Sequence, residues 1–146
     1  MGCEQNGLSE EDVEKTKYLS KQIIFMVWKG VILGESLEDK SLLKIVRIVK
    51  IDVERLEGED RVMTFHRVEV DDNIKDKFIE NAIKSIKQGF YLHIVKNKLM
   101  YVVFKDKMFK FSKGYPELEM ARKHGLSIGI PEEQMPFEHL IDFPWD

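Results

Sequence analysis

Residues 89–114 constrain the fold most, because they predict three short strands joined by almost no connecting chain. The segment reads GFYLHIVKNKLMYVVFKDKMFKFSKG, and its runs 90–96, 99–105 and 107–111 are rich in aromatic and β-branched residues. Asn97-Lys98 and Asp106-Lys107 separate the runs, and Asn and Asp tolerate the left-handed backbone of a two-residue hairpin turn. The segment therefore predicts an antiparallel three-strand meander.

Two-residue loops would fix the register of the meander and the composition of its two faces. A loop at 97–98 places His93 opposite Val102, and a loop at 106–107 places Val102 opposite Phe111. Because side chains alternate along a strand, one face carries a mainly aromatic set: Tyr91, His93, Val95, Met100, Val102, Phe104, Phe109 and Phe111. We expect this face to be core. We expect only half coverage of the other face, which carries Leu92, Ile94, Tyr101, Val103 and Met108, with Lys105 and Lys110 at its far edge.

A further strand and a long hairpin are predicted before the meander. Residues 9–20 predict a surface helix that Ser9 can cap. Residues 22–33 indicate a strand, and continuation of the helix through Trp28 is the alternative, since a short apolar run does not distinguish the two. Period-two alternation over 43–56 and 61–70, with a turn between them at 57–60, predicts a half-buried hairpin.

Two helices are predicted on either side of the meander. Residues 71–88 carry an apolar stripe at helical spacing, and Gly89 can end this helix; the stripe is Ile74, Phe78, Ile79, Ala82, Ile83 and Ile86. Pro116 begins a second helix that we expect to end near His124, with Gly125 as its stop.

This order of elements predicts the α+β class. The sheet should be largely antiparallel, built from the long hairpin and the meander, with the 71–88 helix packed on it and helical termini. We expect residues 1–8 to be a flexible N-terminus and residues 9–146 to form a single domain.

Composition points to a soluble cytoplasmic protein. The chain has 146 residues, of which 43% are hydrophobic and 34% charged, and its longest apolar run, 23–28, is too short to cross a membrane. The lone Cys3 favours a reducing compartment. The sequence shows no metal-ligand spacing, phosphate-binding loop or nucleophile elbow, so we expect no metal and no cofactor.

The charges are segregated along the chain. Residues 84–123 contain ten Lys or Arg against three Asp or Glu, whereas residues 124–146 contain neither Lys nor Arg. The candidate ligand or polyanion surface is Lys96, Lys98, Tyr101, Lys105, Lys107, Lys110 and Lys113. Cations beside aromatic rings bind single-stranded nucleic acid, but lysines at turns and edges are also an ordinary protection against aggregation.

The acidic end of the chain, 131–146, carries Phe137, Phe143 and Trp145. We expect it to fold back over the cationic end of the meander, with its aromatic rings on the half-covered sheet face. This arrangement would mask the basic surface, and burial of the rings would supply most of the free energy of docking.

Two histidines are candidate general bases, His93 in the meander and His66 in the hairpin. A histidine on an apolar strand face is more often a core residue whose ring nitrogens have partners. The sequence assigns no catalytic residue, and it favours a protein that is not an enzyme.

Two short segments carry a family resemblance. The VVFKDK segment over 102–107 and the GIPEEQ segment over 129–134 resemble stretches of small uncharacterised prokaryotic proteins. The resemblance implies a cytoplasmic prokaryotic protein, and it implies no activity.

These observations favour a small cytoplasmic binding or interaction module without catalysis, whose partner is another protein or a second copy of the chain. One alternative is a nucleic-acid-associated protein that uses the lysine-rich meander. A second alternative is a small enzyme with His93 or His66 as general base.

Overall fold

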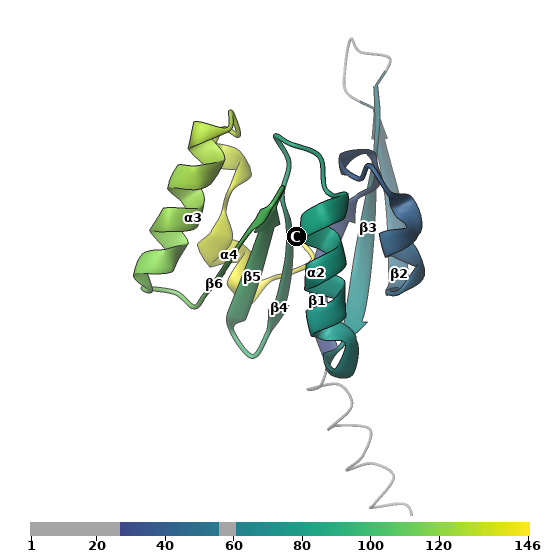
Figure 1. Ribbon diagram of the computed structural model, residues 1–146, viewed down its shortest axis with the longest axis horizontal. Helices are drawn as coiled ribbons and strands as arrows, with labels where there is room; N and C mark the ends of the chain where they lie inside the picture. The colour runs from purple at the N-terminus through teal and green to yellow at the C-terminus, as the bar shows by residue number, and fades with distance from the viewer. Residues whose placement is uncertain (1–26, 56–60) are drawn as a thin grey trace, which may run out of the picture.

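The computed structural model describes residues 27–55 and 61–146, which are organised around one six-stranded antiparallel sheet (Figure 1). The strands lie in the order β2-β3-β1-β4-β5-β6, so β2 and β6 are its two edges. Their bounds are β1 (Val27–Leu33), β2 (Arg47–Arg55), β3 (Val62–Asp71), β4 (Leu92–Lys96), β5 (Leu99–Phe104) and β6 (Lys107–Phe111). The predicted α+β class with a largely antiparallel sheet is confirmed.

Three α-helices and four short 3₁₀ helices accompany the sheet in the described residues: α2 (Lys75–Ser85), α3 (Pro116–Ser127), α4 (Phe137–Asp142), η2 (Gly34–Ser36), η3 (Lys40–Lys44), η4 (Asp72–Ile74) and η5 (Glu132–Gln134). The strand predicted over 22–33 is confirmed for β1, whereas 22–26 lie outside the described residues. The predicted flexible N-terminus, the predicted helix 9–20 and the predicted turn at 57–60 also lie outside them.

The apolar stripe of α2 packs on the sheet as predicted, because Phe78 and Ala82 are fully buried against Leu92, Ile94 and Val103. These strand residues belong to the face that was expected to be half covered. Its apolar end is buried beneath α2, whereas Met108 is 39% exposed and Lys110 is exposed at the other end, so the face is covered only in part, as expected. β3 and β4 are both antiparallel to β1, so they run parallel to each other, and α2 connects them. Such crossovers are nearly always right-handed, so the order of the strands decides which face the helix covers.

The aromatic face is core as predicted, and α3 and α4 cover it (Figure 1). Phe104 and Phe111 of the sheet are fully buried together with Met135 and Phe137 from the chain end. The sheet therefore separates two hydrophobic clusters, one beneath α2 and one beneath α3 and α4.

The first turn of the meander has the predicted register, with His93 opposite Val102. The predicted second loop at 106–107 is wrong, because Phe104 lies opposite Lys107 and Val102 lies opposite Phe109. Asp106 therefore occupies the second position of the turn, where its φ is 62°, and an aspartate tolerates this left-handed backbone. The register changes by two residues, which leaves the faces of the strands unchanged.

The predicted end of the second helix is also wrong, because α3 continues through Gly125 to Ser127. Gly125 is buried beside Met135, and a Cβ at this position would overlap the Met135 sulfur. A larger residue here would therefore force the Met135 side chain to shift. The left-handed backbone that follows the helix belongs to Gly129, whose φ is 93°.

Candidate functional site

The structure divides the predicted lysine surface between the two sides of the sheet. Lysines on the α2 side contact Asp72, Glu38 and the Tyr101 ring; they are Lys96, Lys105 and Lys110. Lysines on the opposite side contact Asp142 and the Phe109 ring; they are Lys98, Lys113 and Lys107. Four of the six lysines are therefore paired with carboxylates.

Tyr101 is the aromatic member of the predicted surface, and it is only 7% exposed. Its ring packs edge-to-face on Trp28 with 5.3 Å between centroids, and its hydroxyl oxygen accepts a hydrogen bond from Lys75 Nζ at 3.1 Å. The ring therefore has no open face on which a nucleic-acid base could stack.

Asp72 organises the charges around this aromatic pair. Its Oδ1 accepts hydrogen bonds from Trp28 Nε1 and from Lys96 Nζ, both at 2.7 Å. The Lys96 and Trp28 hydrogen bonds hold the pKa of the Asp72 carboxyl below its usual range. Lys96 thus binds a carboxylate inside the protein, and its ammonium group is not left free for a phosphate.

The acidic chain end docks on the meander, as the charge segregation predicts. Asp142 lies at the end of α4 and binds Lys98 Nζ at 3.0 Å and the Lys113 ammonium group. These two lysines hold the pKa of Asp142 below its usual range. The Asp142 carboxylate thus contacts two of the basic side chains that the chain end was expected to mask.

The predicted face for this docking is wrong, because the chain end lies on the aromatic face. Phe137 packs on Tyr91 and Phe111, with ring centroids 5.5 Å and 5.8 Å away. Trp145 Nε1 donates to the Val68 carbonyl oxygen at 3.2 Å. Phe143, the third predicted anchor, remains 55% exposed. Because α2 already buries the apolar residues of the other face, the chain end packs on the aromatic face.

Asp142→Asn is expected to free Lys98 and Lys113, and so to raise the salt concentration at which the protein elutes from heparin. Elution in a salt gradient measures the effect. Asp146→Asn is the matched control, because it removes the same charge from a carboxylate that contacts His139 instead of a lysine. Equal shifts for both variants would show that only net charge matters and that Asp142 masks nothing.

The two candidate bases are buried, and each contacts a backbone carbonyl oxygen. His93 Nε2 donates to the Pro144 carbonyl at 2.8 Å, and His66 Nδ1 donates to the Ile32 carbonyl at 3.1 Å. Burial lowers the pKa of His93 to about 4. Neither ring lines the two depressions described below. These contacts are those of core histidines.

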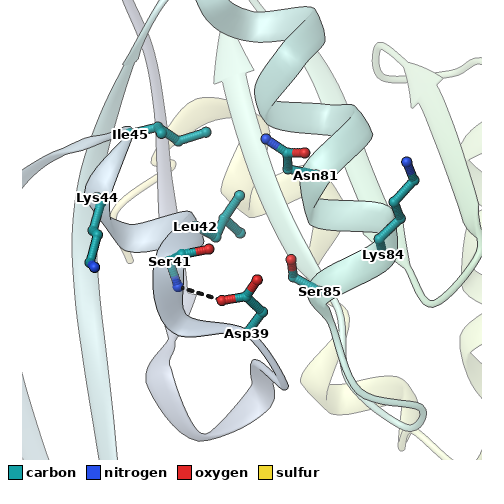
Figure 2. Close-up of a pocket in the computed structure, with 8 residues that line it drawn as sticks. All are labelled: Asp39, Ser41, Leu42, Lys44, Ile45, Asn81, Lys84 and Ser85. Carbon is teal, nitrogen blue, oxygen red and sulfur yellow. Dashed lines mark hydrogen bonds between the residues drawn. The ribbon is translucent and has the colours of Figure 1, made fainter.

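One depression lies between η3 and α2 and has a volume of about 390 Å³ (Figure 2). Figure 2 shows the residues that line it: Asp39, Ser41, Leu42, Lys44, Ile45, Asn81, Lys84 and Ser85. The Asp39 carboxylate accepts a hydrogen bond from the Ser41 N–H at 2.9 Å, and this bond lowers the pKa of Asp39. Asp39 thus caps η3, and the charged side chains of the depression are exposed.

A second depression, of about 220 Å³, lies on the opposite side of the sheet, between β1, the β4–β5 turn and α4. Three lysines line it, Lys29, Lys96 and Lys98, of which Lys96 is bound to Asp72 and Lys98 to Asp142. Within the described residues, every buried side-chain nitrogen and oxygen has a hydrogen-bond partner. Neither depression therefore contains a buried side-chain donor or acceptor that lacks a hydrogen-bond partner.

The edge strand β2 is the most unusual surface of the molecule. Eight of its nine residues are exposed, so the predicted half burial of this hairpin strand is wrong. Nine large apolar side chains are exposed in the described residues, and four of them lie in β2: Ile48 at 39%, Val49 at 48%, Ile51 at 53% and Val53 at 65%. Figure 1 shows the reason, since β2 and the outer part of β3 extend beyond α2.

The two faces of β2 differ in chemistry. Ile51 lies opposite His66, and Val53 lies opposite Thr64. Both face the side of the sheet on which α2 packs, but α2 packs over other strands. The other face is charged and carries Arg47, Lys50, Asp52 and Glu54. The alternation was visible in the sequence, but the sequence did not reveal that this strand lies at the edge of the sheet.

No family model, curated protein or solved structure matches the chain. None of the helices formed within 27–55 and 61–146 combines the length and apolar character needed to cross a bilayer. The same residues contain no cluster of three or more His, Cys, Asp or Glu that could hold a metal ion.

Proposed function

We propose that this chain is a small cytoplasmic prokaryotic interaction module without catalysis of its own, and that its contact surface is the outer side of β2. The observation that carries the proposal is the exposure of Ile51 and Val53, at 53% and 65%, on an edge strand. The cytoplasmic and prokaryotic setting is supported by the lone Cys3 and by the resemblance of residues 102–107 and 129–134.

An edge strand presents a row of backbone N–H and C=O groups to which another strand can pair. Proteins usually protect such edges with lysines, bulges or a covering element. The opposite edge follows this rule, because β6 exposes Lys107 and Lys110 and packs against α3. β2 has a register shift near Val49 but an exposed Ile51 and Val53 beyond it, so pairing there would satisfy backbone groups and bury apolar side chains.

The carboxylate partners of the meander lysines favour this reading over binding of nucleic acid. Lys96, Lys98, Lys105 and Lys113 already contact acidic side chains within the protein. A polyanion would have to replace these contacts, whereas a strand added to β2 would pair with backbone groups at the sheet edge and cover the exposed Ile51 and Val53.

A photocrosslinking amino acid placed at position 53 tests the proposal. We expect Val53→benzoylphenylalanine to give crosslinked protein adducts in extracts of the native cells. Leu126→benzoylphenylalanine is the matched control, since Leu126 is 48% exposed but lies at the end of α3. Ile51→Lys in the position-53 variant should abolish the adducts, because it places a charge in the apolar contact. Equal labelling from positions 53 and 126, or no labelling at all, would contradict the proposal.

A further inference from the structure

We infer that the strand received by β2 is β2 of a second copy of this chain, paired antiparallel about a two-fold axis at Ile51. The inference rests on the proposed function and names the partner of the same surface. It makes the protein a symmetric dimer in which the two six-stranded sheets continue into each other through their β2 edges.

The order of residues in β2 is self-complementary around Ile51. The segment reads Val49-Lys50-Ile51-Asp52-Val53, with a cation on one side of the central residue and an anion on the other. A two-fold axis at the centre places Ile51 opposite its own copy, Lys50 opposite Asp52 of the copy, and Val49 opposite Val53 of the copy. Opposite charges and apolar pairs directly across two strands both stabilise the pairing.

The faces of the strand agree with this register. Lys50 and Asp52 lie opposite Arg67 and Phe65 of β3, whereas Ile51 lies opposite His66, so the charged and apolar residues point to different sides of the sheet. The dimer would therefore carry two Lys50–Asp52 pairs on one side and a continuous apolar contact around Ile51 on the other. Within one chain Lys50 Nζ lies 3.5 Å from Asp52 Oδ1, and Arg67 Nε lies 3.8 Å from Asp52 Oδ2. Because Lys50 and Asp52 are 56% and 37% exposed, such solvent-exposed pairs are weak and can be exchanged for pairs between two copies.

Neighbouring registers are less favourable. An axis at Lys50 or at Asp52 places that residue opposite its own copy, which brings like charges together. An axis at Val53 places Asp52 opposite Glu54, again with like charges. An axis at Val49 falls on the register shift between Ile48 and Lys50, where the strand is irregular. The axis at Ile51 avoids opposed like charges, and it places the irregular position only in its outer pair, Val49 with Val53 of the copy.

Pairing of β2 with the other sheet edge of a second copy is also less favourable. Such a contact joins two different surfaces, and it leaves one β2 and one β6 free to add further copies without limit. β6 also exposes Lys107 and Lys110, and it packs against α3. The β2–β2 contact instead closes on itself and leaves no exposed β2 edge.

Disulfide trapping tests the register in the full chain, with Cys3→Ser as background. Ile51→Cys should form a disulfide-linked dimer under mild oxidation, because the two thiols lie directly across from each other. Val53→Cys alone should not, because its own copy is four residues away along the partner strand. A mixture of Val49→Cys and Val53→Cys proteins should give the mixed dimer. A disulfide dimer of Val53→Cys, with none from Ile51→Cys, would overturn the register.

Sedimentation of the purified chain tests the dimer and its charges. Lys50→Asp and Asp52→Lys should each raise the dissociation constant of the dimer about tenfold or more, since each places like charges opposite one another twice. The double variant Lys50→Asp/Asp52→Lys has the composition of the natural chain and should restore dimerisation. A natural chain that stays monomeric up to about 1 mM, or a double variant that is not restored, would overturn the inference.

The two proposals fail differently. If position 53 crosslinks to another protein in extracts while the purified chain is monomeric, β2 is an interaction surface and the second-copy inference is wrong. If position 53 crosslinks to nothing in extracts or in the purified protein, both are wrong. Crosslinked dimers in the purified protein that disappear with Lys50→Asp support both.

Discussion

Phe78→Ala is expected to lower the free energy of unfolding by about 3–5 kcal/mol, which is the usual cost of removing a buried phenylalanine. Phe78 is fully buried in α2 and lies at the centre of the cluster between the helix and the sheet. The neighbouring strand residues, such as Ile94 and Val103, are fixed by hydrogen bonds to two adjacent strands. They cannot move to fill the cavity, so we expect a loss in the upper part of this range.

Urea or guanidinium titration, followed by circular dichroism, measures this loss. Phe143→Ala is the matched control, because it removes the same side chain from a position that is 55% exposed. We expect a change of less than about 1 kcal/mol for the control. If Phe78→Ala cost no more than the control, α2 would not form the core that the structure places beneath it.

Acidification is expected to remove about 3 kcal/mol of stability through His93 alone. Its pKa is lowered from 6.5 to about 4 in the folded protein, first because of burial, while the hydrogen bond to the Pro144 carbonyl acts in the opposite direction. Between these values the unfolded chain binds a proton that the folded chain does not, so stability falls as the pH falls. The contribution is fully present above pH 6.5 and is lost by about pH 4, and each pKa unit corresponds to about 1.4 kcal/mol.

Denaturant titrations at pH 7 and pH 4 measure this contribution. His93→Gln should be less stable than the natural chain at pH 7, but it should lose about 3 kcal/mol less on acidification. Asp72 and Asp142, whose pKa values are lowered, lose their contributions in both proteins at low pH, so the comparison isolates the histidine. His139→Gln makes the same substitution at an exposed histidine and controls for the change of residue type. An unchanged pH dependence in His93→Gln would show that the ring is not held neutral.

Local patterns in the sequence predicted the elements of this fold well. The stripe from Ile74 to Ile86 and the period-two strands of the meander are signals that span a few residues, and they predicted α2, β4, β5 and β6. Local signals gave the wrong end of α3 and the wrong position of the second meander turn. Gly125 is inside α3 and packs against Met135, and the second meander turn has Asp106 at its left-handed position.

The candidate site was less predictable. The lysines of the meander suggested an open cationic surface, but their partners come from distant parts of the chain. Lys96 and Asp72 are 24 residues apart, Lys98 and Asp142 are 44 apart, and Lys105 and Glu38 are 67 apart. No short pattern contains such a pair. The alternation of Val49, Ile51 and Val53 was visible, but it has the same form in a half-buried strand and in an edge strand.

The sequence by itself determined the strands of the meander and the apolar stripe of α2, which side chains of the meander share a face, and that the acidic chain end would meet the basic meander. These properties follow from turn residues, from periodicity and from net charge. Each of these can be read from a continuous stretch of the sequence. The tertiary structure alone decided that β1 lies between β3 and β4, that α2 therefore covers the face opposite α4, and that β2 lies at the edge. Strand order depends on pairing between residues far apart in the chain, and the exposed surface of β2 follows from that order.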